Sequence, residues 1–148
     1  LAAVEILEKY GVNSEIWSAT SYGELRRDGL ECERENRLNP SKDRKIPFVE
    51  QMLGDGTHPT IAVSDNQIAV PDMVRQWVGG DFTVLGTDGF GRSDTRPSLR
   101  RFFEIDAQHI TLGALSALVR SKEIDAKVYE KALSDLGIER ERFDITAL

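Results

Sequence analysis

The segment that most constrains the fold is a joint between a short β-prone run and a helix. Residues 82–85 read Phe-Thr-Val-Leu, which favours a strand, and the loop that follows contains Gly86, Gly89 and Gly91. Pro97 then stands in the first turn of a predicted helix. A strand, a glycine-containing loop and a helix in this order are typical of α/β folds, which place interfaces and ligand sites at such joints.

Helical and β-prone stretches alternate along the chain. We expect strands over 14–20, 60–64 and 82–85, and helices over 1–10, 22–36, 47–53, 66–78, 99–103, 106–119 and 125–136. Ser21, Asp106 and Asp125 are the expected N-caps. The alternation predicts an α/β fold with a mostly parallel sheet and helices on both faces.

Three strands are few for such a sheet. The chain also begins in helical register, without an initiator Met or a capping residue before the helix. We therefore expect residues 1–148 to be one domain of a larger multidomain chain, lacking the first strand of its sheet. Because an unpaired sheet edge can pair with another chain, self-association of this fragment is expected.

Composition excludes several classes of function. The chain has 148 residues, enough for one domain, and a formal net charge of −6, which argues against a general nucleic-acid binder. Cys32 is the only cysteine, so an internal disulfide is impossible and a reducing, cytoplasmic location is expected. No stretch reaches the roughly 20 apolar residues of a membrane span, so no membrane partner is expected.

Two interpretations of the loop that contains Gly86, Gly89 and Gly91 are possible. Its glycines are spaced Gly-x-x-Gly-x-Gly, which differs from the dinucleotide fingerprint, so backbone freedom at a tight joint is favoured over a phosphate cradle. The charged residues of the loop could form an ion-pair network that fixes the loop against a neighbouring domain, or could simply be solvated. These residues are Asp88, Arg92, Asp94 and Arg96.

The remaining candidate side chains favour structural readings. His109 lies in an apolar helix, where a buried, hydrogen-bonded histidine is favoured over a catalytic one. His58 stands in a turn, and Cys32 has no obvious base partner. Asp65 follows a predicted strand, where a capping or loop hydrogen bond competes with a site role. Trp17 and Trp77 are expected to be packing anchors.

Several ordered stretches together resemble one known family. They are Glu5-Ile-Leu-Glu-Lys-Tyr-Gly-Val, Ser18-Ala-Thr-Ser-Tyr-Gly-Glu-Leu-Arg-Arg, Cys32-Glu-Arg-Glu-Asn-Arg-Leu-Asn-Pro, Leu85-Gly-Thr-Asp-Gly-Phe-Gly-Arg-Ser-Asp-Thr-Arg and Leu99-Arg-Arg-Phe-Phe-Glu-Ile-Asp-Ala. Over nearly its whole length the chain resembles the C-terminal domain of the homodimeric first component of the pyruvate dehydrogenase complex. The piece Phe90-Gly-Arg-Ser is also similar to a loop in the C-terminal domain of transketolases.

The resemblance implies a three-layer sandwich of the transketolase C-terminal type. It further implies an enzyme that decarboxylates pyruvate with thiamine diphosphate and magnesium and reductively acetylates the lipoyl group of its partner, the dihydrolipoyl acetyltransferase component. The cofactors belong to upstream domains, so this fragment is expected to bind none and to be inactive alone. No catalytic, cofactor or metal residue can be carried over. Its expected role is to support the rest of its own chain and the homodimer mate, through Asp88, Phe90, Arg92, Ser93, Asp94 and Arg96.

Two other functions stay open. The domain could be a docking module for the second component, because the related heterotetrameric enzymes dock through their C-terminal domains. It could also be a free-standing α/β enzyme with a site at the strand ends, although no nucleophile–base or metal constellation is visible in the sequence.

Overall fold

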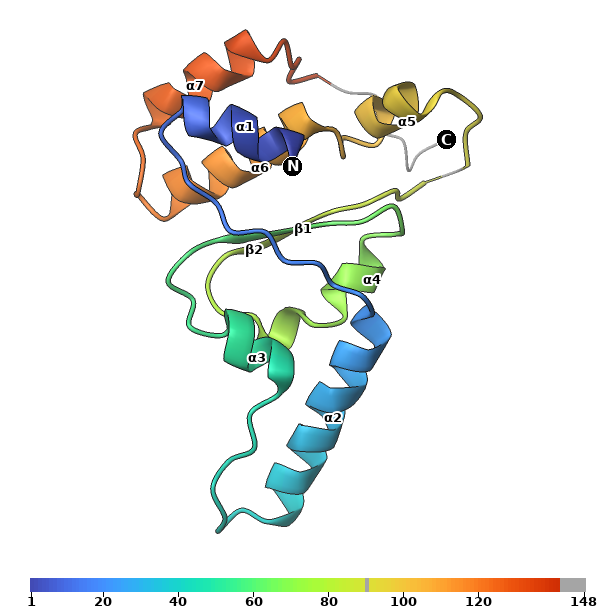
Figure 1. The fold of residues 1–148 in the computed structure, drawn as a ribbon, viewed down its shortest axis with the longest axis vertical. Helices are drawn as coiled ribbons and strands as arrows, with labels where there is room; N and C mark the ends of the chain where they lie inside the picture. The colour runs from blue at the N-terminus through green and yellow to red at the C-terminus, as the bar shows by residue number, and fades with distance from the viewer. Residues whose placement is uncertain (90, 142–148) are drawn as a thin grey trace.

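A small parallel sheet lies at the centre of the molecule, with helices on both of its faces (Figure 1). Its strands are β1 (Thr60–Val63) and β2 (Phe82–Leu85), and Thr60 stands opposite Phe82 in the parallel register. The computed structural model describes residues 1–89 and 91–141. The parallel pairing confirms the α/β prediction, because a helical crossover connects the two strands.

Helices lie on both sides of this sheet, and most of them agree with the sequence-based expectation. They are α1 (Ala2–Lys9), α2 (Tyr22–Leu38), α3 (Phe48–Leu53), α4 (Ala69–Asp72), the 3-10 turn η1 (Arg75–Trp77), α5 (Arg96–Phe102), α6 (Ala107–Arg120) and α7 (Ala126–Asp135). The helix expected over 66–78 is instead two short pieces, at residues 69–72 and 75–77. Three predicted N-caps are confirmed: the side chains of Ser21, Asp106 and Asp125 each accept a hydrogen bond from a backbone N–H in the first turn.

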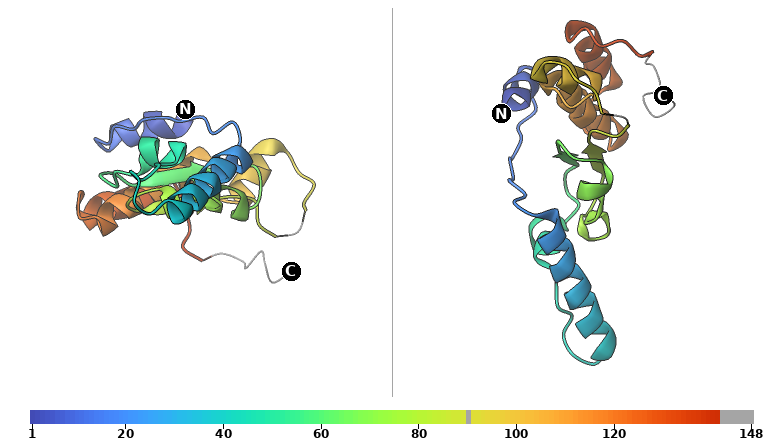
Figure 2. Two further views of the ribbon diagram at one scale, coloured as in Figure 1. Left: turned by 90° about the horizontal axis from the view of Figure 1, so that it is seen from below. Right: turned by 90° about the vertical axis from the view of Figure 1, so that its right-hand side faces the viewer.

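The two faces of the sheet contact different hydrophobic cores. Ala62, Phe82 and Val84 belong to a buried cluster with Val49 and Trp77, which lie in α3 and η1. On the opposite side, a second cluster joins α1, α6 and α7 around residues that include Leu7, Leu112, Leu115 and Ala132. The layer order is therefore α1/α6/α7, the sheet, then α2/α3/α4/η1, and Figure 2 shows these layers from two further sides.

The predicted strand over residues 14–20 is wrong. These residues are not in a strand and are all exposed. A strand requires a hydrogen-bonded neighbour, and no part of the chain that the structure describes supplies one for this segment. The expectation that Trp17 is a packing anchor is also wrong, because this residue is 53% exposed.

Helix α2 projects away from the rest of the molecule, and the chain returns along it to α3 (Figure 1). Gly29 lies inside this helix without breaking it, although glycine has a low helix propensity. It is buried where α2 passes the indole of Trp77, and an added Cβ would overlap that ring. Glycine is therefore required at this position by the close approach of α2 to η1.

Candidate functional site

The carboxyl ends of β1 and β2 are tied to each other by the loops that follow them. The Thr87 N–H donates to the Asn66 carbonyl at 2.9 Å, and the Thr87 hydroxyl donates to the Asp65 carbonyl at 2.9 Å. The carboxylate of Asp88 accepts from the Ile68 N–H at 2.8 Å. The start of the glycine loop is therefore fixed by backbone groups of the neighbouring loop, and these groups are engaged in holding the joint together.

Gly86 makes this joint possible. A Cβ at residue 86 would lie 2.7 Å from the Asn66 carbonyl oxygen and 2.8 Å from the Ile68 nitrogen. Both distances are shorter than van der Waals contact, and both partners are backbone atoms. The geometry supports the reading that the glycine serves close backbone approach rather than a phosphate cradle.

Replacing Gly86 with Ala is expected to destabilise the domain by about 1–2 kcal/mol, because the two loops must separate to admit the methyl group. Gly91→Ala is the matched control in the same loop, since an added Cβ there meets nothing within 4 Å and the residue does not have a positive φ. Chemical denaturation of both variants measures the difference. Equal stability of the two would contradict the role given to Gly86.

The second half of the loop presents its side chains to solvent. Residues 91–96 are exposed, and Phe90 lies outside the described residues. Arg92 and Asp94 approach to 3.8 Å, and the Arg92 guanidinium lies 4.5 Å from the centre of the Phe102 ring. Of the four charged residues singled out in the sequence, the structure therefore pairs Arg92 with Asp94. Asp88 instead accepts a hydrogen bond from the Ile68 backbone, and Arg96 is the first residue of α5.

The loop ends in a capped helix. The Thr95 N–H donates to the Asp94 carboxylate at 2.7 Å, and the Thr95 hydroxyl caps α5 by accepting from the Ser98 N–H. Pro97 follows in the first turn, as predicted. The loop is thus anchored at both ends, which holds the exposed side chains of residues 91–96 between two fixed points.

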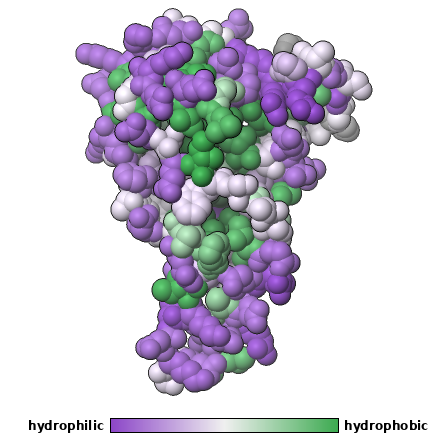
Figure 3. All heavy atoms as spheres, in the orientation of Figure 1, coloured by the Kyte–Doolittle hydropathy of each residue, from purple (hydrophilic) through white to green (hydrophobic). Residues whose placement is uncertain are grey.

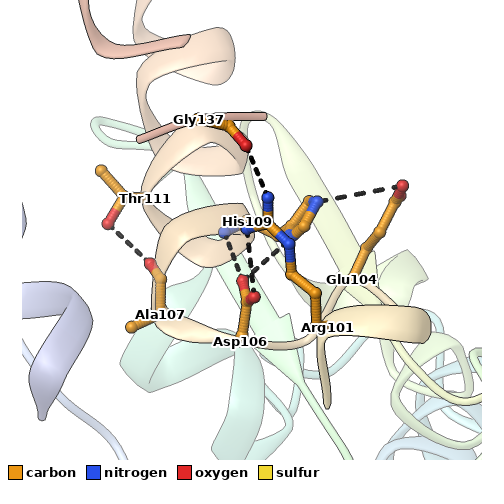
Figure 4. Close-up of polar contacts among 7 residues, drawn as sticks. All are labelled: Arg101, Glu104, Asp106, Ala107, His109, Thr111 and Gly137. Carbon is orange, nitrogen blue, oxygen red and sulfur yellow. Dashed lines mark hydrogen bonds and ion pairs between the residues drawn. The ribbon is translucent and has the colours of Figure 1, made fainter. Parts of the chain in front are cut away.

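A cluster of charged groups joins the end of α5 to α6 and α7 (Figure 4). Asp106 caps α6 by accepting from the His109 N–H at 2.9 Å, and the His109 ring Nδ1 lies 2.7 Å from the same carboxylate. Arg101 lies 3.4 Å from Asp106 and donates to the Gly137 carbonyl at 2.7 Å. His109 is therefore largely buried and hydrogen-bonded, as expected, and the cluster links three helices.

Competing effects act on the Asp106 carboxyl. Burial favours its neutral form, but the hydrogen bonds from the backbone and ring of His109, together with Arg101, favour the anion more strongly. The net result is a lowered pKa for Asp106. Glu104 approaches the second ring nitrogen of His109 at 3.9 Å, so carboxylates stand beside both nitrogens of the imidazole.

This arrangement is suited to holding helices together. In residues 1–89 and 91–141, neither histidine is hydrogen-bonded to a hydroxyl or thiol that could act as a nucleophile. His58 is exposed, 3.8 Å from Glu123. The side chain of Asp65 accepts no hydrogen bond in the described part of the chain, so it caps no helix. The loop hydrogen bond that was the other expectation for this residue is made by its carbonyl, which accepts from the Thr87 hydroxyl. Burial and neighbouring carboxylates raise the pKa of the Cys32 thiol, which disfavours the reactive thiolate.

A depression of about 250 Å³ lies near the far end of α2. Its lining residues are Glu35, Asn36, Asn39, Lys42, Asp43 and Lys45. Their polar groups already bind one another: the Asn36 side chain exchanges two 2.8 Å hydrogen bonds with the backbone of Lys45, and Lys45 forms an ion pair with Glu35. These contacts hold the returning chain against the projecting helix.

Sequence reasoning missed two connections that the structure shows. Arg101 donates to the carbonyl of Gly137, 36 residues away. Arg120 donates to Asp81 at 2.8 Å and to Thr83 at 3.2 Å, which ties α6 to β2. Neither contact is indicated by a local pattern in the sequence. The contact between the His109 ring and Asp106 is different, because His109 stands three residues after the predicted cap.

Comparison with known proteins assigns the domain. The family described as transketolase-like TK C-terminal domain matches residues 1–106. The pyruvate dehydrogenase E1 component of Pseudomonas aeruginosa is 44% identical over 142 residues, which are 95% of this chain and 16% of that protein. The protein of the same name from Escherichia coli K12 is 43% identical, with the same coverage of both chains. The one from Corynebacterium glutamicum is 47% identical over 133 residues, which are 89% of this chain and 14% of that protein.

This chain thus spans only 14–16% of the length of these three relatives, while the relatives match nearly all of it. The family match covers both strands, the glycine loop and helices α1 to α5. The architecture agrees with it, since a parallel sheet lies between layers of helices. The chain belongs to the transketolase-like C-terminal domain family.

Proposed function

We propose that this chain is the C-terminal domain of a thiamine-diphosphate-dependent pyruvate dehydrogenase first component. The observation that carries the proposal is the identity of 43–44% to two proteins of that name across 95% of the chain. In the whole enzyme, pyruvate is decarboxylated and the two-carbon unit reductively acetylates a lipoyl group. The partners are the remainder of its own chain, the homodimer mate and the dihydrolipoyl acetyltransferase component, in the cytoplasm.

The described residues do not fit a site for thiamine diphosphate and magnesium. They contain no group of three or more His, Cys, Asp or Glu that could hold a metal ion. At the start of the glycine loop, the Thr87 N–H, the Thr87 hydroxyl and the Asp88 carboxylate all bind the neighbouring loop. We therefore assign no step of the reaction to this domain and place the cofactors in the remainder of the enzyme.

The role that remains for the domain is structural. Asp88 anchors the loop, and Arg92, Ser93, Asp94 and Arg96 stand exposed between two fixed ends. A fixed loop with exposed charges is suited to contact a neighbouring domain or the other subunit, because little conformational entropy is lost when it docks. We include Phe90 in this surface on the strength of the family resemblance alone. No described helix has the length and apolar character needed to cross a bilayer.

The double variant Arg92→Ala/Asp94→Ala in the full-length enzyme tests this role. We expect it to weaken dimerisation by about tenfold or more, because interface residues with defined positions contribute on the order of 1–2 kcal/mol. Analytical ultracentrifugation measures the dissociation constant. Glu130→Ala/Arg140→Ala, which removes an exposed ion pair elsewhere on the domain, is the control. An unchanged dissociation constant in the loop variant would contradict the proposed interface.

A further inference from the structure

Helix α2, the returning chain and α3 form the projecting part of the molecule, and we call residues 22–53 the arm (Figure 1). Contacts on one side of α2 hold the arm together. The Phe48 N–H donates to the Asp28 carboxylate at 2.7 Å, and Glu35 forms an ion pair with Lys45. These contacts fix the returning chain and α3 against α2 and leave the opposite, outward side of the helix unused.

The outward side of α2 carries only arginine, leucine and glycine. At about 100° per residue, an arc of about 120° around the helix contains seven exposed residues. They are Gly23, Arg26, Arg27, Leu30, Arg34, Arg37 and Leu38. The acidic residues of the helix all lie outside this arc, so positive charge is concentrated on one side of α2. We call the seven residues the outward face.

Most of the positive charge on the outward face is unpaired. Arg27 forms an ion pair with Glu24, three residues before it. The side chains of Arg26, Arg34 and Arg37 form no ion pair or hydrogen bond with any described residue. The formal net charge of the chain is −6, so this basic helix face is a local exception. A concentrated basic surface on an acidic domain is suited to attract an acidic partner.

Exposed apolar side chains are also concentrated on the arm. Leu30 and Leu38 of the outward face are 39% and 59% exposed. Five of the nine large apolar residues that are exposed in the described part of the chain belong to the arm, the other three being Ile46, Phe48 and Met52. Figure 3 shows hydrophobic atoms among hydrophilic ones along the arm, in the lower half of the view. Such a concentration is typical of an interaction surface.

We propose that the outward face of α2 binds the homodimer mate, at a segment outside residues 1–148 of that subunit. The segment would place apolar side chains on Leu30 and Leu38 and border them with Asp and Glu, which pair with the arginines. An apolar centre with a charged border is the usual anatomy of a protein interface. The inference rests on the proposed function, which makes this chain one domain of a homodimeric enzyme.

The position of the arm favours the mate over the rest of the same subunit. In Figures 1 and 2, the arm extends away from Leu1 and its tip lies at the opposite end of the molecule. In the proposed enzyme the remainder of the same subunit joins the chain at Leu1, so the arm points away from that junction. The α2 helix of a second copy does not fit, because the arginines of two outward faces would repel each other.

Photochemical cross-linking in the full-length enzyme tests the proposal. Benzoylphenylalanine in place of Leu38 should give, on irradiation, a product with the mass of two chains. Its cross-linked peptide should come from outside residues 1–148 and contain Asp or Glu beside apolar residues. The same replacement of Glu130, an exposed residue of α7, is the control and should give little two-chain product.

Other cross-linking results would overturn the proposal. A product with the mass of one chain would place the contact within the same subunit. A two-chain product joined through residues 1–148 would indicate a second copy of this domain instead. The absence of a product, or equal yields of two-chain product from both positions, would show that the outward face does not bind the mate.

Arg34→Gln/Arg37→Gln adds a second readout. Glutamine keeps the helix propensity of arginine but removes the charge, so we expect the dissociation constant of the full-length dimer to rise about tenfold. Lys9→Gln/Lys127→Gln removes the same charge from two exposed residues outside the arm and should change it little. In the 148-residue chain the arginine variant should keep its melting temperature within about 2 °C. An unchanged dissociation constant, or equal increases for both variants, would contradict the proposal.

The outcome is separable from that of the proposed function. A two-chain product from residue 38 in a full-length protein that does not decarboxylate pyruvate would overturn the proposed activity and support the contact. A one-chain product in a protein that does decarboxylate pyruvate would overturn the contact and support the activity.

Discussion

Asp106→Ala is expected to lower the free energy of unfolding by about 2–3 kcal/mol. The variant removes the N-cap of α6, for which about 1 kcal/mol is typical, and also the charged hydrogen bonds with His109 and Arg101. These groups connect α5 and α6 to the end of α7, so the loss is not confined to one helix. Urea denaturation at neutral pH measures the effect.

Asp125→Ala is the matched control, because Asp125 caps α7 without a histidine or arginine partner. It should cost only about 1 kcal/mol, the contribution of a cap alone. Asp106→Asn should fall between the wild type and the alanine variant, since an amide still caps a helix. If Asp106→Ala and Asp125→Ala cost the same, the three-helix cluster does not stabilise the domain beyond its cap.

The pH dependence of this effect has a definite sign. The pKa of Asp106 is lowered in the folded domain, so its contribution is complete above the unfolded-state pKa of about 4 and is lost as the pH falls through the folded-state value. The difference between wild type and Asp106→Ala should therefore be constant near neutrality and shrink at more acidic pH. A difference that grows on acidification would contradict the lowered pKa.

Gly29→Ala is expected to destabilise the domain by about 2 kcal/mol, although alanine is the better helix former. The added methyl group would overlap the indole of Trp77, which is buried and anchored by a 3.1 Å hydrogen bond to Glu33. Because the ring is held on several sides, either α2 or η1 must move. Thermal or urea unfolding of the variant measures the cost.

Gly23→Ala in the same helix is the control. Its nearest atom to an added Cβ is the Ser21 hydroxyl at 3.8 Å, an ordinary contact. We expect it to stabilise the domain by up to about 0.5–1 kcal/mol through helix propensity. Combining Gly29→Ala with Trp77→Phe should recover part of the loss, since a smaller ring leaves room. Additive effects of the two changes would show that the glycine and the indole are not in contact.

Local signals in the sequence predicted the helices well. Ser21, Asp106 and Asp125 were predicted as N-caps, and the structure confirms each of them. A cap is formed by residues within three positions of each other, so its chemistry can be read from a short window. The parallel pairing of the runs that became β1 and β2 also followed from the alternation of helices and strands.

Non-local features could not be predicted in the same way. The segment 14–20 has the composition of a strand, but whether it becomes one depends on a neighbour that its own residues do not specify. The buried Gly29 illustrates the same limit, because glycine is required there by the indole of Trp77, 48 positions away in the chain. In the candidate site, the fixed start of the loop depends on backbone atoms of Asn66 and Ile68, which no local motif reports.

Calorimetric titration of the 148-residue chain with thiamine diphosphate and magnesium tests the proposal that this domain has a structural role and that the cofactors bind elsewhere in the enzyme. We expect no saturable heat of binding, because the described residues provide no metal-binding cluster and the Thr87 N–H at the start of the glycine loop already donates to the Asn66 carbonyl. Saturable binding would overturn the proposal and would place part of the cofactor site in this domain.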